Sequence, residues 1–369
     1  MKILHICRNL AGSTVFPQLF ETLHALGVEQ TVFVPEESRE NIGRNVPKDV
    51  ETRYELTLRK SDTLFFFRKA ERTCPVIERT IPLDSYDLLH AHTLFTDGSI
   101  ALRLHKAHGI PFVVTLRYSD VAVIWKYEWH LHPMAREILR AASAVIVLSP
   151  VVKTQAMSFL PEGERETLTR KTFVIPNGID PLWLNGTPRT SLHSPIVIGF
   201  AGKLNRRKRP MDALAAVHML DQGNGRYVFL GCGTGPLEEE MQAALAPEDR
   251  LLGAISGREN MCDFYSQCDL LLVPSAAETF GMVYLEAMSQ GLPVLYTRGQ
   301  GFDGQFPEGE VGFAVDCGAI KEQSMRILDA LAQYEERSKR CVRNAAEYAW
   351  PKIGRRWLDL YHAALEGKR

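Results

Sequence analysis

Two glutamates, Glu278 and Glu286, lie in the otherwise apolar stretch PSAAETFGMVYLEAMSQGLPVL. Burying a carboxylate without a partner is costly, so we expect hydrogen-bond donors or a polar ligand to face these two groups. The run DLLLVP before them predicts a strand, and MVYLEAMSQG predicts a helix that ends at Gly291 and Pro293. Glu278 then lies at the carboxyl end of a strand and Glu286 about one turn into the helix, where open α/β sheets bind ligands.

A second group of candidates lies in GFAGKLNRRKRP, which contains Lys203 and Lys208 and leads into a predicted helix near Pro210. Flexible glycines, two lysines and a helix N-terminus together predict an anion-binding loop. The alternative is an exposed basic turn, because runs of charge are usually solvated. The later stretch FLGCGTGP predicts a glycine-lined loop beside a ligand, with Gly233 as a candidate. Because Pro236 stands where a dinucleotide fingerprint needs glycine, a nicotinamide dehydrogenase is not expected.

Histidines provide the candidate metal ligands. His90 and His92 end the predicted strand DLLHAH, and strand alternation turns them to the same face. A metal pair is one interpretation, as it is for His130 and His132. No cluster of carboxylates or cysteines accompanies them, so we expect no metal site and instead a histidine that faces the ligand.

Two aromatic and partly basic stretches, residues 61–72 and 123–133, have two interpretations. Such stretches are most often core or domain interface. The alternative is a surface for a membrane-associated or aromatic acceptor.

Composition restricts the class of protein. Of 369 residues, 45% are apolar and 24% are charged, which is typical of a globular protein with room for two domains. The net charge of -1 argues against a general nucleic-acid binder. Seven cysteines without a C-x-x-C pair predict neither a disulfide framework nor a zinc knuckle and favour a reducing cytoplasm. The opening MKILHIC predicts a strand and not a signal peptide, and no apolar run reaches the roughly 18 residues of a membrane span.

Apolar runs alternate with helical patterns along both halves of the chain, which predicts α/β domains with parallel sheets. The runs are KILHIC, QTVFVP, DLLHAH, FVVTL, AVIVLS and TFVIP in the first half, and IVIGFAG, YVFLG, RLLGAI, DLLLVPS, LPVLY and GFAV in the second. Between them, residues 177–195 are rich in Pro, Gly, Asn and Ser and are interpreted as a hinge. Two Rossmann-like halves joined in this way are expected to face each other across a ligand cleft.

These motifs together resemble the GT-B glycosyltransferases, specifically the large retaining family 4, the "glycosyl transferases group 1". Glu278 and Glu286 form the family's E-x7-E, and VIPNGID, GKLNRRK, LGCGTGP and VGFAV occur in the family's order. The resemblance covers nearly the whole chain. It implies an N-terminal acceptor domain, a hinge, a C-terminal donor domain and a terminal helix that crosses back to the first domain, at residues 1–180, 181–195, 196–347 and 348–369.

The resemblance implies a nucleotide-diphosphate sugar as donor. Glu286 would accept hydrogen bonds from the ribose, Glu278 would lie beside the donor sugar, and Lys203 and Lys208 would neutralise the leaving phosphates. Lys203 stands where the family usually has arginine, and His92 matches the histidine near the reacting sugar carbon. The remaining donor-binding residues so implied are Gly202, Gly233, Asn177, Gly281, Met282 and Val283.

On the acceptor side the resemblance implies Gly12, Arg117 and Asp120. TLRYSD resembles the family's TLHGSD but has Arg117 in place of histidine and Tyr118 in place of glycine, and only Gly12 remains of the usual N-terminal glycine pair.

The implied activity is that of a retaining hexosyltransferase that needs no cofactor and no metal, since protein cations can stabilise the departing diphosphate. No D-x-D occurs in the sequence. A UDP- or GDP-sugar is the favoured donor; a glycan, a lipid-linked glycan or a small molecule is the acceptor, in polysaccharide or glycolipid biosynthesis. A cytoplasmic location is expected, with contact at the inner face of the membrane as an alternative. The competing functions are epimerisation or phosphorolysis on the same fold, or non-catalytic binding of a nucleotide sugar.

Overall fold

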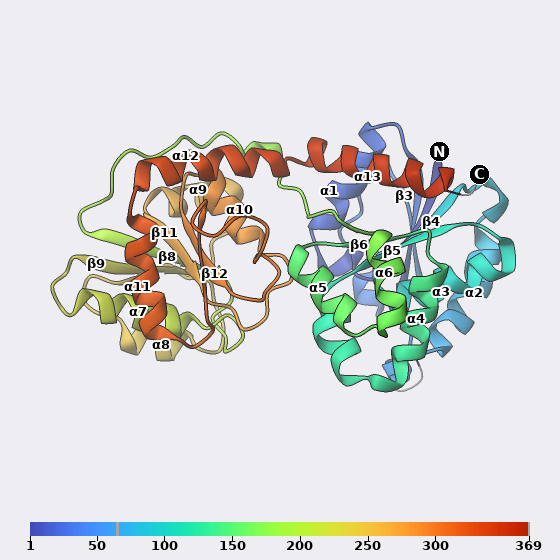
Figure 1. Cartoon of the computed structure of the whole chain (residues 1–369), viewed down its shortest axis with the longest axis horizontal. Coiled ribbons are helices and arrows are strands. Elements are labelled where there is room, and N and C mark those ends of the chain that lie inside the picture. The colour runs from blue at the N-terminus through green and yellow to red at the C-terminus, as the bar shows by residue number, and fades with distance from the viewer. Residues whose placement is uncertain (64–65, 368–369) are drawn as a thin grey trace. The chain divides into compact units, whose positions relative to one another are not determined.

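The computed structural model describes residues 1–63 and 66–367. The chain divides into two compact units, one made of residues 1–178 and 350–369 and the other of residues 179–349. Each unit is built around its own parallel sheet with helices on both faces (Figure 1).

In the described part of the first unit, seven strands pair in the order β3-β2-β1-β4-β5-β6-β7, each parallel to its neighbours. They are β1 (Lys2–Ile6), β2 (Glu29–Glu36), β3 (Glu51–Leu56), β4 (Leu88–Ala91), β5 (Phe112–Leu116), β6 (Ala144–Val147) and β7 (Thr172–Val174). The strand order reverses between β1 and β4, which is where doubly wound sheets open a crevice for ligands.

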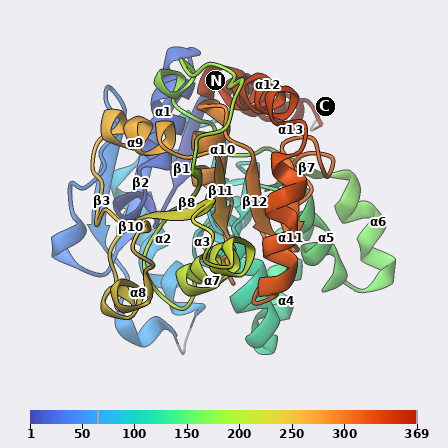
Figure 2. The same cartoon turned by 90° about the vertical axis from the view of Figure 1, so that its left-hand side faces the viewer.

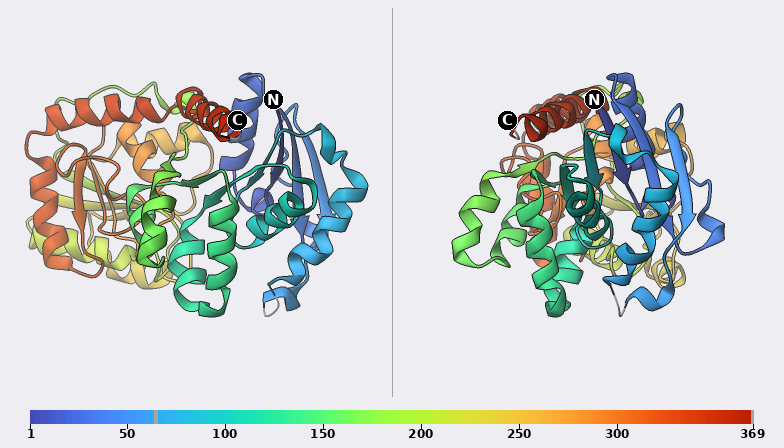
Figure 3. Two further views of the ribbon diagram at one scale, coloured as in Figure 1. Left: turned by 45° about the vertical axis from the view of Figure 1, so that its right-hand side comes forward. Right: turned by 90° about the vertical axis from the view of Figure 1, so that its right-hand side faces the viewer.

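Helices of the first unit cover its sheet on two sides. They are α1 (Val15–Ala25), α2 (Arg68–Thr80), α3 (Thr96–His108), α4 (His132–Ala141), α5 (Pro150–Ser158), α6 (Glu162–Arg170) and α13 (Trp350–Glu366). Helices α2, α3 and α4 pack side by side and share one apolar core with the sheet. Helices α1 and α13 pack against each other and fill a separate core, as both views of Figure 3 show. The sheet is therefore buried on both faces, which explains its nearly continuous apolar strands.

The C-terminal helix α13 is part of the core of the first unit. Trp357 and Tyr361 are buried against the sheet, and the Tyr361 hydroxyl lies 2.8 Å from Nδ1 of His90 on β4. At the start of the helix, the Trp350 indole donates to Gln18 Oε1 at 2.7 Å. These contacts fix the helix along its length. In the sequence, the whole of the second unit lies between this helix and the rest of the first unit.

In the second unit, six strands within the described residues pair in the order β10-β9-β8-β11-β12-β13, again all parallel. They are β8 (Ile196–Ala201), β9 (Tyr227–Cys232), β10 (Arg250–Leu251), β11 (Leu270–Val273), β12 (Val294–Thr297) and β13 (Gly312–Val315). The helices are α7 (Pro210–Asp221), α8 (Glu238–Ala244), α9 (Arg258–Ser266), α10 (Met282–Ser289), α11 (Ile320–Leu331) and α12 (Tyr334–Ala345). Figure 2 shows α7 and α11 side by side, where they pack against each other, while α10 packs against α12.

The predicted fold class, α/β with two Rossmann-like domains and parallel sheets, is confirmed. Each apolar run named above contains a strand, and the helix after Glu278 ends at Ser289, as Gly291 and Pro293 predict. Strand β3 was not predicted, because its sequence ETRYEL is polar and none of its side chains is fully buried. Within the described residues, no helix combines the length and the apolar character needed to cross a membrane.

The segment predicted as the hinge, residues 181–195, is held within the second unit by hydrogen bonds. Arg189 is its main anchor. The guanidinium donates to the carbonyls of Tyr265, Ser266, Cys268 and Gln290 at 2.8–3.1 Å, and the amide donates to Ser338 Oγ. An arginine that satisfies four carbonyls fixes the path of the chain at this point.

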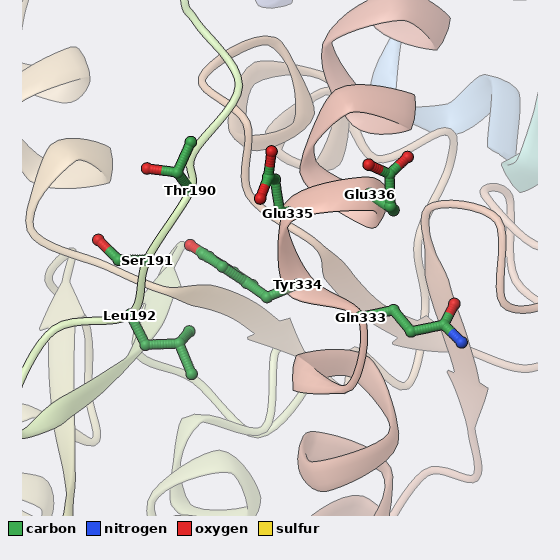
Figure 4. Close-up of a pocket in the computed structure, with 7 residues that line it drawn as sticks. All are labelled: Thr190, Ser191, Leu192, Gln333, Tyr334, Glu335 and Glu336. Atoms are coloured by element: carbon green, nitrogen blue, oxygen red, sulfur yellow. The ribbon is translucent and has the colours of Figure 1, made fainter.

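An open cavity of about 480 Å³ lies between this segment and the start of α12, lined by Thr190, Ser191, Leu192, Gln333, Tyr334, Glu335 and Glu336 (Figure 4). The Tyr334 hydroxyl is buried and has no hydrogen-bond partner among the described residues. Burial raises the pKa of this hydroxyl, so it stays protonated.

Two buried tyrosines therefore give a matched test of hydrogen bonding in the core. Tyr361→Phe would leave His90 Nδ1 buried without its partner, and we expect the free energy of unfolding to fall by about 1–3 kcal/mol. Tyr334→Phe removes a hydroxyl that has no partner among the described residues, and we expect no loss of stability. Calorimetric unfolding of both variants measures the difference; equal losses would contradict the assigned role of the Tyr361 hydroxyl.

Candidate active site

In the second unit, the loops that follow β8 and β9 touch through their backbones. The Gly202 amide donates to the Cys232 carbonyl at 3.0 Å, and the Gly233 amide donates to the Gly253 carbonyl at 2.7 Å. A Cβ atom on Gly233 would lie 1.8 Å from the Gly202 carbonyl oxygen, and the φ angle of Gly233 is +133°. Gly233 is therefore required as glycine for this close approach, and the two predicted glycines lie together.

Lys208 and Glu278 form an ion pair between the loop after β8 and the loop after β11. Lys208 Nζ lies 2.5 Å from Glu278 Oε2, and the two side chains are 23% and 11% exposed. The Lys208 amide donates to Asn205 Oδ1 at 2.9 Å, which fixes the loop that presents the lysine. The Glu278 amide donates to Gln300 Oε1 at 3.0 Å. A cation is thus held, partly exposed, at the carboxyl end of the second sheet.

The N-terminus of α10 follows directly. Gly281 precedes the helix with a φ angle of +85°, and a Cβ atom there would lie 2.4 Å from the Tyr284 ring and 3.4 Å from Glu278 Cγ. Met282 and Val283 occupy the first turn, where helix amides have no partner within the helix. This turn lies beside Glu278, and its free amides and the helix dipole favour an anion.

Glu286 lies further along α10 and has a different partner from Glu278. The hydroxyl of Tyr265, at the end of α9, donates to Glu286 Oε2 at 3.1 Å. Burial raises the pKa of Glu286, and this hydrogen bond acts against the rise. Tyr265 was not predicted from the sequence, because no spacing rule relates the helix before β11 to the helix after it.

The second predicted lysine, Lys203, lies in a different environment. It is exposed, and its ammonium group has no hydrogen-bond or ion-pair partner among the described residues; its carbonyl accepts from the Asn205 amide at 2.9 Å. The structure thus brings together Lys208, Glu278 and Gly281, while Lys203 remains available to meet an anion that arrives from solvent.

In the first unit, three histidines form a buried cluster at the centre of the sheet. His5 Nδ1 lies 3.1 Å from His92 Nε2, and the rings of His90 and His92 are 3.8 Å apart. Burial lowers the pKa of His5 to about 3 and lowers the pKa of His90 and His92 well below the ordinary value, so all three are neutral. His5 was not among the candidates predicted from the sequence, although its place on β1 opposite His90 follows once the strand order is known.

Ligand atoms of these three histidines lie within 4.8 Å of one another, as a metal site would require. Both nitrogens of His90 are however engaged, with the Tyr361 hydroxyl at 2.8 Å and the Thr115 hydroxyl at 2.9 Å. Its ring therefore offers no free ligand atom, and we interpret the cluster as a hydrogen-bond network. His130 and His132 do not pair either, since His130 lies near Glu128 and His132 bonds the Trp125 carbonyl.

His92, Arg117 and Asp120 meet where β4 and β5 end. Arg117 Nε donates to the His92 carbonyl at 3.2 Å, and the Arg117 amide donates to Asp120 Oδ2 at 2.8 Å. Burial raises the pKa of Asp120 to about 6. The His92 ring is fully enclosed between Phe16 and Phe20, so the group that it presents here is its carbonyl. A role of the ring at the reacting sugar stays a prediction.

The other first-unit candidates lie apart from this group in the chain. Gly12 is exposed in the loop after β1, and a Cβ atom there would meet nothing within 4 Å, so the backbone does not demand glycine. Asn177 follows β7, in the first unit and not in the unit that holds the other donor-site candidates. Of the aromatic stretch 61–72, residues 64 and 65 lie outside the described residues.

Two family models together match most of the chain. Residues 189–348 match the family model "Glycosyl transferases group 1", and residues 12–182 match "Glycosyltransferase Family 4". A D-inositol 3-phosphate glycosyltransferase of Corynebacterium urealyticum is 28% identical over 306 residues, which are 76% of this chain and 72% of that protein.

Solved structures share the fold. HepE of Anabaena in complex with UDP has a TM-score of 0.72 and 18% identity over 98% of this chain and 100% of that one. Sucrose-phosphate synthase of Thermosynechococcus elongatus has a TM-score of 0.72 and 19% identity, with full coverage of both chains.

The ion pair between Lys208 and Glu278 is testable by a double-mutant cycle. We expect Lys208→Met and Glu278→Gln each to lower the free energy of unfolding and to show a coupling energy of about 1–3 kcal/mol, because the pair is only partly exposed. As the control, Lys203→Met should change stability by less than about 0.5 kcal/mol, since the Lys203 ammonium group has no partner among the described residues. Additive effects of the two pair mutations would show that the contact contributes nothing.

Proposed function

Because the chain belongs to the GT-B glycosyltransferases of family 4, the glycosyl transferases group 1, we propose that it transfers a hexosyl group with retention from a nucleotide-diphosphate sugar to an acceptor hydroxyl. The observation that supports this proposal best is the Lys208–Glu278 pair beside the N-terminus of α10. A partly exposed cation and free helix amides at the carboxyl end of a parallel sheet suit a diphosphate.

In the proposed mechanism, the main catalytic contribution is electrostatic. As the glycosidic bond to the diphosphate breaks, negative charge grows on the leaving phosphate and positive charge on the sugar ring. Lys208, the exposed Lys203 and the amides of Met282 and Val283 stabilise the leaving group. Gly202 and Gly233 let the loop backbones approach it. In this mechanism the protein cations neutralise the diphosphate in place of a metal ion, so no metal or cofactor is needed.

Glu278 has the role of a hydrogen-bond acceptor for the donor sugar. Its Oε2 is bound to Lys208 and its Oε1 accepts from the Thr279 amide at 3.2 Å. A carboxylate held in this way is a weak nucleophile. The acceptor hydroxyl therefore attacks from the face of the leaving group, and the departing phosphate takes its proton. A glycosyl adduct on Glu278 would contradict this mechanism.

Glu286 binds the ribose hydroxyls of the donor in this proposal, with Tyr265 holding the carboxylate. UDP is a plausible nucleotide in view of the complex of Anabaena HepE with UDP, and GDP is the alternative.

The acceptor side is assigned to the first unit, at Arg117, Asp120, His92 and Gly12. Asn177 is assigned to the donor. We propose a glycan, a lipid-linked glycan or a small molecule as acceptor, in polysaccharide or glycolipid biosynthesis at the cytoplasmic face of a membrane. The exposed aromatic side chains Phe67, Tyr127 and Trp129 support this location, with Lys126 Nζ 5.3 Å from the Tyr127 ring.

The test is release of nucleoside diphosphate from UDP-, GDP- and ADP-glucose in EDTA. We expect slow hydrolysis of one donor without metal, loss of this hydrolysis in Lys208→Met, and release of the sugar first as the anomer that the donor carries. A requirement for divalent metal or for inorganic phosphate, or release of the opposite anomer, would contradict the corresponding part of the proposal.

The pair Tyr265–Glu286 predicts a specific pH dependence. Glu286 must be ionised to accept from ribose, so nucleotide affinity should fall as the pH decreases through its raised pKa. Tyr265→Phe removes the hydrogen bond that counteracts this rise, so the fall should begin at a higher pH. At pH values above that range, Tyr265→Phe should bind the nucleotide selected in the donor assay roughly tenfold more weakly than the wild type does. The variant should also discriminate less between this nucleotide and its 2′-deoxy analogue.

Tyr284→Phe is the matched control, because this buried tyrosine donates to the Val273 carbonyl at 2.7 Å and not to a carboxylate. Its pH profile of nucleotide binding should keep the wild-type midpoint. The same shift in both variants would mean that loss of packing, and not Glu286, is responsible.

Membrane contact predicts cosedimentation with vesicles that contain anionic lipid. Trp129→Ala should reduce binding several-fold, since Trp129 is 77% exposed and an indole favours the lipid interface. The control is Met325→Ala on α11 of the second unit, which removes a side chain that is 58% exposed and should leave binding unchanged. Equal binding of the wild type and Trp129→Ala would exclude this surface.

A further inference from the structure

Three cationic side chains of the first unit gather around the loop between β4 and α3. Arg117 donates to the His92 carbonyl, and Lys69 Nζ lies 3.2 Å from the hydroxyl of Thr96. The Arg8 amide donates to Asp97 Oδ1 at 3.3 Å, and the positive charge of the Arg8 side chain acts on both Lys69 and Asp97. Cations from the loop after β1, from α2 and from the loop after β5 therefore lie around the start of α3 and the loop before it.

Arg117 is the most unusual of the three, because it is a nearly buried guanidinium that makes no ion pair among the described residues. The carboxylates of Asp120 and Asp97 act on its charge only from a longer distance. The side chain is 8% exposed and lies over the Phe16 ring, with 4.6 Å between the guanidinium carbon and the ring centre. Its only side-chain hydrogen bond in the described structure uses Nε, and no carboxylate there lies within ion-pair distance. The two terminal nitrogens of the guanidinium are not fully buried, so both can contact a ligand.

Lys69 has a similar environment. It is 5% exposed and Nζ lies 3.3 Å from the centre of the Phe66 ring. Burial lowers its pKa to about 8, which leaves it mostly charged near neutrality. Its polar contact, the Thr96 hydroxyl, is neutral.

The carboxylates of this region do not balance these charges. Asp120 accepts from the amides of Leu94 and Arg117 and offsets one of the three positive charges, while Asp62 pairs with Arg72. Asp97 is fully buried, its Oδ2 has no partner among the described residues, and burial raises its pKa to about 7. Near neutrality the group thus has more positive than negative charge.

We propose that Arg117, with Lys69 and Arg8, forms an anion-binding subsite of the first unit that takes a phosphate or carboxylate group of the acceptor. The unpartnered, almost buried guanidinium supports this inference, since burying a charge without a partner is costly unless a ligand supplies the partner. The positive end of the α3 dipole, at the helix start Thr96, also favours an anion. The inference rests on the proposed function only in assigning the anionic group to the acceptor.

The residue type suits this role. A guanidinium presents two parallel donors to a phosphate or carboxylate, which neither histidine nor lysine can do. Arg117 stands where the resembling family motif has histidine, so the anion preference would belong to this chain and not to the fold.

The experiment titrates glucose 6-phosphate, glucuronate and glucose into the full-length protein by calorimetry. We expect binding of at least one of the two anionic sugars and not of glucose, and at least about tenfold weaker binding in Arg117→Met. The anion that binds more tightly identifies a phosphate or a carboxylate as the ligand group. Absence of binding by both anions, or equal binding of glucose, would overturn the inference.

Lys208→Met is the matched control, because a phosphate could also enter the proposed donor site. If Lys208→Met loses binding and Arg117→Met does not, the anion occupies the donor site and the inference is wrong. Titration of UDP and GDP in the same samples tests the proposed function separately. Arg117→His and Arg117→Lys should fold and keep only weak anion binding; wild-type binding by both variants would also overturn the inference.

Discussion

The ion pair between Lys208 and Glu278 is the interaction on which the rest of the candidate site depends. It joins the loop after β8 to the loop after β11, and the backbone around it is fixed in turn: the Gly301 amide donates to the Glu278 carbonyl at 3.0 Å. The carboxylate in its apolar stretch is thus stabilised by a protein cation. The same contact keeps a positive charge at the carboxyl end of the second sheet, next to the N-terminus of α10, where a diphosphate can replace or share it.

The buried polar groups of the first unit are stabilised in a different way. The histidines of its sheet are neutral: His5 is hydrogen-bonded to His92, and His90 is hydrogen-bonded to Thr115 and Tyr361. His90 thus connects the sheet to α13 without net charge. The charged groups lie instead at the carboxyl ends of the strands, where Arg117 makes no ion pair among the described residues. One sheet edge therefore holds a paired cation and the other an unpaired one, which is consistent with different ligands for the two units.

Much of the fold follows from the sequence, because strands buried on both faces are continuous apolar runs and their order in α/β proteins is restricted. The ends of those runs are enough to place Glu278, Lys208 and Arg117 at sheet edges. Residues such as Tyr265 and His5 could not be found in this way, since they reach the site by tertiary packing from other elements. The enclosure of the His92 ring could not be predicted for the same reason. Strand alternation predicts the face of the sheet on which the ring lies, but only the packing of α1 shows that Phe16 and Phe20 cover it.

Titration calorimetry of a nucleoside diphosphate in EDTA tests the donor site most directly. UDP and GDP would each be titrated into the wild-type protein, Lys208→Met and Glu286→Gln. We expect one of the two nucleotides to bind the wild type without metal and to bind each variant at least about tenfold more weakly, because the cation serves the diphosphate and the carboxylate serves the ribose. Binding that is unchanged in both variants, or that requires a divalent metal, would contradict the assignment of the site.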